Sequence, residues 1–300
     1  MPSCIPSPPF PHFQRKELAE YSTFGIGGPA RFFACAQNVQ AMREMLLYAK
    51  AYQLPYFILG KGSNTLFDDR GFDGLVILNG IEGCEHHEGV FKVGSGYSFP
   101  RLGQISAKLG YHGLEFAAGI PATVGGAIFM NAGAGPQQTF DALHTVDYLT
   151  EEGALITFKK DQLQWGYRST SFQHQKGAIV GACFVLSKQE EAQAHQRKLL
   201  SYRLETQPYK MKSLGCVFRN PQGGIAGKWI EELGLKGLRV GGVSVSTKHA
   251  NFIVNDQEGS AQDVSELIQK IQERIYKEKG VFLEEEIRRI PYTGPEDVSS

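Results

Sequence analysis

Glycine clusters that each follow an apolar segment are the feature that most constrains the fold of this chain. Two stand out: residues 60–64 (GKGSN), and residues 119–127 (GIPATVGGA), which lead to 131–134 (NAGA). Residues without bulky side chains let the backbone approach a ligand closely, so such turns are typical of phosphate-binding segments. A plain tight turn and a glycine-rich core crossing remain open as alternatives. Neither cluster matches the P-loop or the GxGxxG pattern, which disfavours a P-loop NTPase and an ordinary Rossmann dehydrogenase.

Charge and apolar content exclude several classes of protein. The chain has 31 Lys and Arg against 31 Asp and Glu, so no overall field attracts nucleic acid or an anionic membrane. Its longest apolar stretch, 178–186, is too short to span a bilayer, and its first residues lack a signal pattern. The five cysteines form no CxxC pair, which argues against a disulfide framework and a zinc site. We expect a cytoplasmic monomer without nucleic-acid or membrane partners.

Apolar periodicity predicts an α+β chain. Residues 1–20 are expected to form a flexible tail. Strands at 30–36 and 56–59 flank a helix that Asn38 caps, which indicates a small α/β part ending near residue 80. A sheet-rich part follows, with these strands and one helix: 90–93, 145–150, 155–159, 179–186 and the helix 99–108.

The last third has its own helices and strands. A polar helix over 189–205 leads into it. Ser260 and Asp263 form a candidate capping box for a long helix that Gly280 ends. The other expected elements are a helix at 226–233 and strands at 251–254 and 282–290. The last strand would place Glu284, Glu286 and Arg288 on one face and apolar residues on the other.

Seven motifs occur in an order that resembles one family. They are TFGIGG (23–28), GKGSN, GIPATVGGA with NAGA, GYR (166–168), GCVFRNP (215–221), KHANFIVN (248–255) and EEEIR (284–288). Over residues 21–290 the chain is similar to the UDP-N-acetylenolpyruvoylglucosamine reductase family, and to its shorter class. The resemblance implies an FAD-binding fold of the vanillyl-alcohol-oxidase (p-cresol methylhydroxylase) type in two subdomains, 21–80 and 81–188. A bridging helix, 189–208, and a C-terminal α/β substrate-binding domain, 209–300, would follow.

The activity that the resemblance implies is a reduction. Such an enzyme uses NADPH and noncovalent FAD to convert UDP-N-acetylglucosamine enolpyruvate into UDP-N-acetylmuramate, a step of peptidoglycan synthesis on which cell shape and division depend. The residues expected to hold FAD all lie in the glycine-rich segments: Gly60, Lys61, Gly62, Ser63, Asn64, Gly119, Ile120, Pro121, Thr123, Val124, Gly125, Gly126, Asn131 and Gly133. The family usually has glycine at the position of Ala122.

The catalytic residues implied by the resemblance are Arg168, Cys216 and Glu286. Arg168 and Glu286 would stabilise an enolate, and Cys216 would donate a proton where relatives often carry serine. Structural roles remain open alternatives: an ion pair for Arg168, a solvated carboxylate for Glu286 and an inert buried thiol for Cys216. Four residues are candidates to bind the UDP-sugar and its carboxylate: Tyr167, Asn220, His249 and Arg288.

Other readings of the sequence remain open. No two histidines have metal-ligand spacing on a helix, and the adjacent His86 and His87 would point to opposite faces of a strand, so we predict no catalytic metal. One alternative function is a flavin-dependent oxidase or dehydrogenase of the same fold that acts on an alcohol or hydroxy acid. Another is a non-enzymatic interaction module in which the glycine clusters are only turns.

Overall fold

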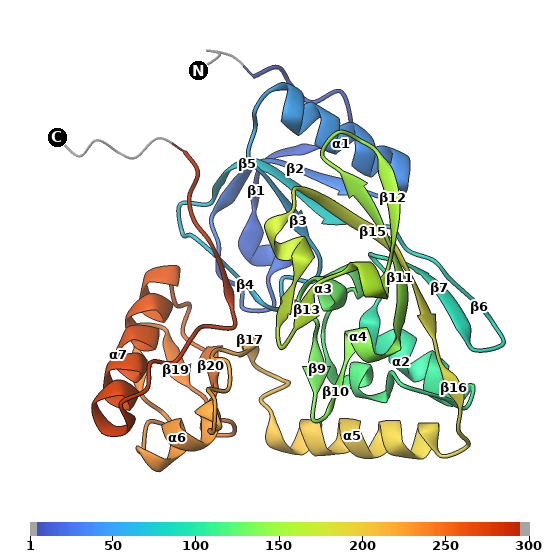
Figure 1. Cartoon of the computed structure of the whole chain (residues 1–300). Coiled ribbons are helices and arrows are strands. Elements are labelled where there is room, and N and C mark those ends of the chain that lie inside the picture. Colours follow the sequence, from blue (N-terminus) through green and yellow to red (C-terminus); the bar gives the residue numbers. More distant parts are fainter. Residues whose placement is uncertain (1–4, 295–300) are drawn as a thin grey trace. The chain divides into compact units, whose positions relative to one another are not determined.

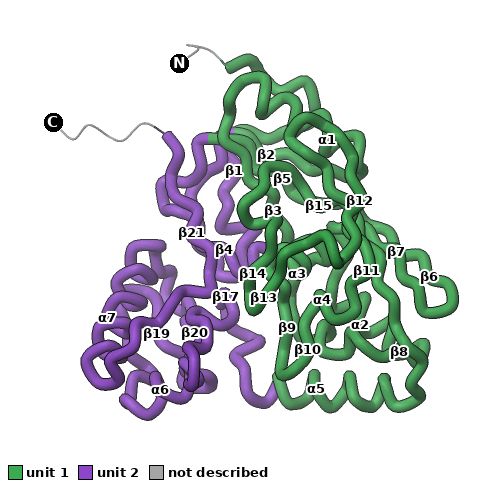
Figure 2. The backbone as a smooth tube through the Cα atoms, viewed as in Figure 1, with its two compact units in different colours: residues 1–14, 32–61, 74–203 green, residues 15–31, 62–73, 204–300 purple. Residues whose placement is uncertain are grey.

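The computed structural model describes residues 5–294 and divides into two compact units, each coloured separately in Figure 2. Unit 1 consists of Met1–Gln14, Phe32–Lys61 and Gly74–Arg203. Unit 2 consists of Arg15–Arg31, Gly62–Asp73 and Leu204–Ser300. Two short N-terminal segments therefore belong with the last third of the chain. The expected assignment of residue ranges to flavin-binding subdomains and a substrate-binding domain stays a prediction.

Unit 1 contains most of a four-stranded sheet with the order β1-β2-β5-β3 (Figure 1). These strands are β1 (Phe13–Glu17), β2 (Pro29–Ala36), β5 (Phe72–Asn79) and β3 (Tyr56–Leu59). Helix α1 (Val39–Ala51) begins as predicted, because the Asn38 side chain accepts a hydrogen bond from Ala41 N at 2.8 Å. It buries Met42, Met45 and Leu46 in a core shared with this sheet.

A second, antiparallel sheet of unit 1 has the order β12-β11-β15-β7-β6. Its strands are β12 (Leu155–Lys159), β11 (Leu143–Thr150), β15 (Gly177–Val185), β7 (Val90–Gly94) and β6 (Cys84–His87). Val180 lies in the core with α1, whereas its neighbour Ile179 lies in a second core. That second core includes residues of α2 (Phe99–Lys108), η2 (Glu115–Gly119), α3 (Val124–Phe129) and α4 (Thr139–Ala142). The sheet is thus packed on both faces.

Short elements complete unit 1. Two-residue strands pair as β9 (Gly133–Ala134) with β10 (Gln137–Gln138), β13 (Trp165–Gly166) with β14 (Ser169–Thr170), and β8 (Tyr111–His112) with β16 (Ser187–Lys188). The 3₁₀ helices η3 (Lys160–Gln162) and η4 (Ser171–His174) also belong to it, while η1 (Leu18–Tyr21) is in unit 2.

Two expectations for the N-terminal half are corrected. The glycine-rich segment 119–127 is not a turn throughout: it is helical from Val124, because Thr123 Oγ1 caps the helix by accepting a hydrogen bond from Gly126 N. Residues 5–20 do not form a loose tail. Phe10 is buried in the core that contains α1, Leu18 is also buried, and Tyr48 Oη donates a hydrogen bond to Pro6 O. Burial of these apolar side chains favours an ordered segment over a loose tail. Residues 1–4 lie outside the described part.

Unit 2 contains an antiparallel sheet with the order β17-β20-β19-β18. Its strands are β17 (Lys212–Cys216), β20 (Phe252–Asn255), β19 (Val243–Val245) and β18 (Arg239–Val240), and its helices are α6 (Ala226–Glu232) and α7 (Ala261–Lys279). Helix α5 (Ala192–Thr206) contains the boundary between the units. The capping box of α7 is confirmed, and Gly280 ends this helix with a φ of 68°. None of the helices within residues 5–294 has an apolar stretch that could cross a membrane.

The strand expected over 282–290 is shorter than predicted. Only β21 (Arg288–Ile290) is a strand, and it pairs in parallel with β4 (Thr65–Phe67). The preceding residues turn to a different partner, because Glu286 N donates to Val217 O at 2.7 Å and Arg219 N donates to Glu284 O at 2.9 Å. The predicted alternation still holds: Leu283 and Ile287 are buried in the core of unit 2.

Candidate functional site

The two glycine-rich turns meet inside unit 1. Gly60 follows β3, and a Cβ placed on it would lie 2.6 Å from Thr123 Oγ1 at the start of α3. Only glycine allows this approach. Gly125 is buried and its amide donates to Ser95 O at 2.7 Å, whereas Gly126 is exposed and a Cβ there would meet Thr123 Oγ1 alone, at 3.3 Å. The turns therefore offer small, close-packed backbone segments, which is the kind of surface that a dinucleotide diphosphate requires.

The GKGSN turn passes from unit 1 to unit 2 between Lys61 and Gly62. Gly62 has a φ of 61°, and a Cβ on it would lie 2.3 Å from Tyr21 O. Both the backbone conformation and the lack of space therefore require glycine. Lys61 is exposed, and Ser63 is half-buried. Three further predicted flavin-binding residues, Gly119, Ile120 and Pro121, lie just before α3, and Val124 is its first residue.

Arg168 is held in unit 1 against the NAGA segment. It lies with Tyr167 at the tip of the β13–β14 hairpin, and its φ of 55° is unusual for a residue with a side chain. Its guanidinium donates to Gly133 O at 3.0 Å and to Asn131 O at 3.4 Å. Its Cζ lies 4.9 Å from the centre of the Tyr167 ring. These contacts fix a permanent positive charge beside two predicted flavin-binding residues.

Asn131 anchors that segment from within. It is fully buried, with a φ of 41°. Its Nδ2 donates to Gly166 O and to Gln138 Oε1, both at 2.8 Å, and its Oδ1 accepts from Phe140 N at 3.1 Å. Because the side-chain amide uses both its donor and its acceptor inside the protein, Asn131 shapes the segment that carries Arg168.

In unit 2, backbone hydrogen bonds and one side-chain hydrogen bond gather four further predicted residues. The segment that begins with Cys216 pairs with residues 284–286, which include Glu286. Asn64 Nδ2 donates to Glu286 O at 3.0 Å, and Asn64 O accepts from Arg288 N at 2.9 Å. Asn64, predicted to bind FAD, thus braces the chain that carries Glu286 and Arg288. Burial lowers the pKa of the Arg288 guanidinium.

Local backbone geometry sets the position of Cys216. The pairing of β17 with β20 shifts register between Ser213 and Cys216, and Gly215 in this stretch has a φ of 78°. A Cβ on Gly215 would meet nothing within 4 Å, so the left-handed backbone, rather than crowding, requires glycine there. The half-buried thiol of Cys216 follows this turn directly.

A buried amide outside the set of predicted site residues, that of Asn251, holds the same segment. Asn251 Oδ1 accepts from Phe218 N at 3.0 Å, and Asn251 Nδ2 donates to Phe218 O at 2.8 Å. The sequence contains a signal for this structural role: Asn251 lies directly before an apolar strand in KHANFIVN, and a polar residue that is buried there needs a hydrogen-bond partner. Asn220 caps the start of α6 by accepting from Ala226 N at 3.1 Å, and His249 Nδ1 accepts from Asn251 N at 3.3 Å.

The predicted site residues therefore form two groups. Unit 1 brings together Gly60 with Thr123, and Asn131 and Gly133 with Arg168. Unit 2 brings together the segments that carry Asn64, Cys216, Glu286 and Arg288. The roles of the individual residues stay predictions.

Comparisons with known proteins decide the family. Residues 30–159 match the model of an FAD binding domain, and residues 207–290 match that of the C-terminal domain of UDP-N-acetylenolpyruvoylglucosamine reductase. A reductase of that name from Protochlamydia amoebophila is 53% identical over 276 residues, which is 92% of each chain. The Chlamydia abortus reductase is 46% identical over 95% of this chain and 97% of its own. This chain belongs to the UDP-N-acetylenolpyruvoylglucosamine reductase family.

A solved structure agrees with this assignment. The reductase of the same name from Thermus caldophilus has a TM-score of 0.80 and 37% identity, and the match covers 93% of this chain and 98% of that one. The expected α+β class with an FAD-binding fold and a C-terminal domain is confirmed. The chain is an enzyme, a flavoprotein oxidoreductase of peptidoglycan precursor synthesis. The cofactor predictions, FAD and NADPH, are confirmed at the level of the family.

Proposed function

We propose that this chain uses NADPH to reduce UDP-N-acetylglucosamine enolpyruvate to UDP-N-acetylmuramate. The observation that carries the proposal is the pairing of residues 217–219 with 284–286 in unit 2. It places Cys216 and Glu286, the two residues with proposed roles in handling protons, on adjoining backbone segments. Identities of 53% and 46% to reductases of this name, over 92% and 95% of this chain, support the same substrate.

The residues present suit FAD. Gly60, Thr123 and Gly126 would hold the diphosphate, since their close-packed turns leave little side-chain bulk and keep Gly126 exposed. The other predicted flavin-binding residues adjoin these turns or lie in the NAGA segment. When bound, FAD carries hydride from NADPH to the substrate. The residues of the chain must then supply charge stabilisation and a proton.

We assign the charge stabilisation to Arg168 and Glu286, and the proton donation to Cys216. Addition of hydride to the methylene carbon leaves an enolate on the carbon that bears the carboxylate. Arg168 provides a fixed positive charge for this group, because its guanidinium is anchored on Gly133 O and Asn131 O. Glu286 in its protonated form would donate a hydrogen bond to the enolate, and the Cys216 thiol would protonate the carbon.

The remaining predicted residues would bind the nucleotide sugar. Arg288, Asn220 and His249 of unit 2 and Tyr167 of unit 1 are proposed to contact the UDP-sugar and the carboxylate. In this proposal the last third of the chain is the substrate-binding domain. We further propose that the enzyme is a monomer that works in the cytoplasm.

Single-turnover kinetics of the two half-reactions tests this function. Arg168→Lys keeps the charge but loses the two-carbonyl anchor, and Glu286→Gln removes the acidic proton while retaining the backbone contacts. Each should slow flavin reoxidation by the enolpyruvyl substrate by roughly 100-fold or more, while flavin reduction by NADPH stays nearly unchanged. Matched controls are Arg197→Lys on α5 and Glu284→Gln, whose side chains are exposed. Equal slowing of both half-reactions would assign Arg168 and Glu286 structural roles and count against the proposal.

A further inference from the structure

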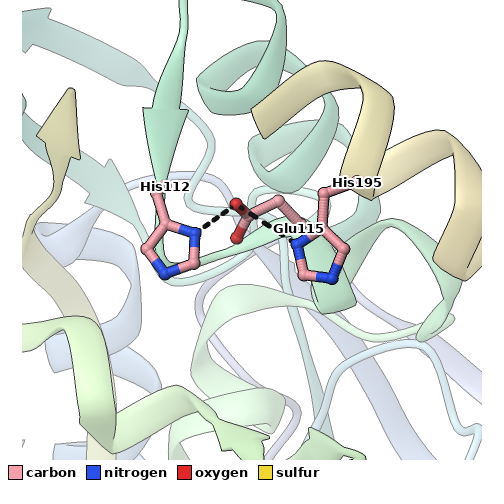
Figure 3. A group of neighbouring side chains, drawn as sticks. All are labelled: His112, Glu115 and His195. Atoms are coloured by element: carbon pink, nitrogen blue, oxygen red, sulfur yellow. Dashed lines mark hydrogen bonds and ion pairs between the residues drawn. The ribbon is translucent and has the colours of Figure 1, made fainter. Parts of the chain in front are cut away.

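Three side chains that belong to none of the predicted flavin or substrate groups converge in unit 1. They are His112 of β8, Glu115 of η2 and His195 of α5 (Figure 3). Both imidazoles direct Nδ1 toward the same carboxylate oxygen: His112 Nδ1 lies 2.6 Å from Glu115 Oε1, and His195 Nδ1 lies 3.8 Å from it. One candidate ligand atom from each residue lies within 4.8 Å of the others.

The Glu115 carboxylate is buried and held by the backbone, unlike the carboxylate of an ordinary surface ion pair. The Glu115 side chain is completely buried, and its Oε2 accepts a hydrogen bond from Gly113 N at 2.8 Å. This amide fixes the carboxylate and leaves Oε1 to the two imidazoles. Burial raises the pKa of Glu115, but the bonds from Gly113 N, its own amide and His112 outweigh that effect and lower the pKa overall.

The elements that carry the histidines are held in place independently of the cluster. His112 pairs with Ser187 where β8 meets β16, and Gln189 N donates to Gly110 O at 2.9 Å just before α5 begins. Lys188 Nζ donates to Leu109 O at 2.8 Å. These bonds tie the residues that lead into α5 to β8 and to the turn before it, so the convergence of His112 and His195 follows from the fold.

We propose that His112, Glu115 and His195 bind one divalent transition-metal cation of the zinc type. Two imidazole nitrogens and one carboxylate oxygen are a common protein ligand set for such a cation, with solvent in the fourth position. Tetrahedral bonds of about 2.1 Å place ligand atoms about 3.4 Å apart. His112 would retreat slightly from Glu115 and His195 would approach it slightly. The side chains of His112 and His195 are 37% and 44% exposed, so a cation can enter from solvent.

The cation would have a structural role. Among the described residues of α5, only Ala192 and Gln196 are buried, and Leu199 packs half-buried against the core of unit 1. A metal bridge from His195 to Glu115 and His112 would fasten its first turn to η2 and β8. The site is independent of the proposed function, and it leaves the prediction of no catalytic metal as it stands.

Titration of the FAD-loaded, tag-free full-length chain with Zn²⁺ after chelator treatment tests the proposal. We expect one ion per chain, and Co²⁺ in its place should give the visible absorption of four- or five-coordinate nitrogen and oxygen ligation. His195→Asn and Glu115→Gln should each weaken binding by more than about tenfold, whereas His87→Asn, at an 88% exposed side chain, should not. Saturating Zn²⁺ should raise the unfolding temperature of the wild type but not of His195→Asn.

Imidazole nitrogen NMR on the wild-type protein keeps the test independent of variant folding. Zn²⁺ should shift the Nδ1 resonances of two histidines of the wild-type protein. Absence of saturable binding at one ion per chain would overturn the proposal. So would unchanged affinity in well-folded His195→Asn and Glu115→Gln, or an intense thiolate charge-transfer band with Co²⁺, which would place the ion on cysteine.

Discussion

Cys216 depends on its neighbour for the position that makes a chemical role feasible. Gly215 adopts a backbone conformation that costs a residue with a side chain roughly 1–2 kcal/mol. The space around the missing Cβ of Gly215 is open. Crowding therefore does not explain why residue 215 is glycine. The left-handed backbone at Gly215, which orients the thiol of the following residue, does explain it. The half-buried Cys216 is placed by a register shift in β17 rather than by packing in the core.

Replacement of Cys216 separates a proton donor from an inert thiol. If Cys216 protonates the substrate carbon, Cys216→Ala should slow the oxidative half-reaction by roughly 100-fold or more and leave NADPH-dependent flavin reduction nearly intact. Cys216→Ser should recover much of that rate, because a hydroxyl can donate a proton from the same position. Stopped-flow absorbance of the flavin in each half-reaction makes the comparison, with Cys183→Ala on β15 as a control thiol. An Ala variant that forms product at the wild-type rate would exclude Cys216 as the acid.

At the scale of elements, regular local signals made the structure predictable. The Asn38 cap, helix α2 over Phe99–Lys108, and the capping box of α7 are confirmed because each depends on residues within one or two turns. The prediction of one strand over 282–290 was wrong in part, because the residues that pair with this segment, Val217 and Thr65, are far away in the sequence. Apolar periodicity indicates which face of a strand is buried, but it does not indicate which other strand pairs with it.

Candidate site residues show the same division. Motif order located the segments that carry Arg168, Cys216 and Glu286. It did not show that Asn64 braces Glu286 or that Asn251 fixes Phe218, because these hydrogen bonds join distant parts of the chain. The convergence of His112, Glu115 and His195 was also invisible, since their spacing does not place them on one helix. Such groupings require the tertiary structure.

The capping box of α7 supports a prediction about stability and pH. Asp263 accepts hydrogen bonds from Ser260 N at 2.9 Å and from Gly242 N at 3.2 Å. The bond from Ser260 N is the main cause that lowers the pKa of Asp263, and the bond from Gly242 N adds to it, against a smaller effect of burial. Asp263→Ala should therefore reduce the free energy of unfolding by about 1–3 kcal/mol at neutral pH.

The sign of the pH dependence follows from the lowered pKa. The stabilisation by Asp263 is fully present above the unfolded-state value of about 3.9 and is lost as the pH falls through the lower folded-state value. Denaturant unfolding of wild type and Asp263→Ala should show a difference that shrinks below about pH 4. Glu278→Ala, at an exposed carboxylate near the other end of α7, should change stability by less than about 0.5 kcal/mol. A difference that grows in acid would contradict the assigned role of Asp263.

At the scale of the whole molecule, the proposal divides ligand binding between the two units. Most residues expected to hold FAD lie in unit 1, whereas most residues expected to hold the UDP-sugar lie in unit 2. Hydrogen exchange can test this division directly, because a bound ligand slows the local openings that expose backbone amides. Addition of FAD to apoprotein should protect 119–126 and 131–133 most strongly. Subsequent addition of the enolpyruvyl substrate should protect 216–220 and 284–288.

A matched pair of glycine variants makes the exchange experiment specific. Gly126→Leu should lose the FAD-dependent protection of unit 1, because its side chain would occupy space that we assign to the diphosphate. Circular dichroism should stay native, because a Cβ at this position would meet only Thr123 Oγ1. Gly125→Leu should instead disturb the fold itself, since its Cβ would lie 3.0 Å from Ser95 Cβ and 3.2 Å from Ser95 O. Exchange measured by mass spectrometry should therefore show a selective ligand defect in the first variant and general loosening around 95 and 123–128 in the second. FAD-dependent protection confined to residues 204–294, or full retention of FAD by Gly126→Leu, would contradict the assignment of the flavin to the turns of unit 1.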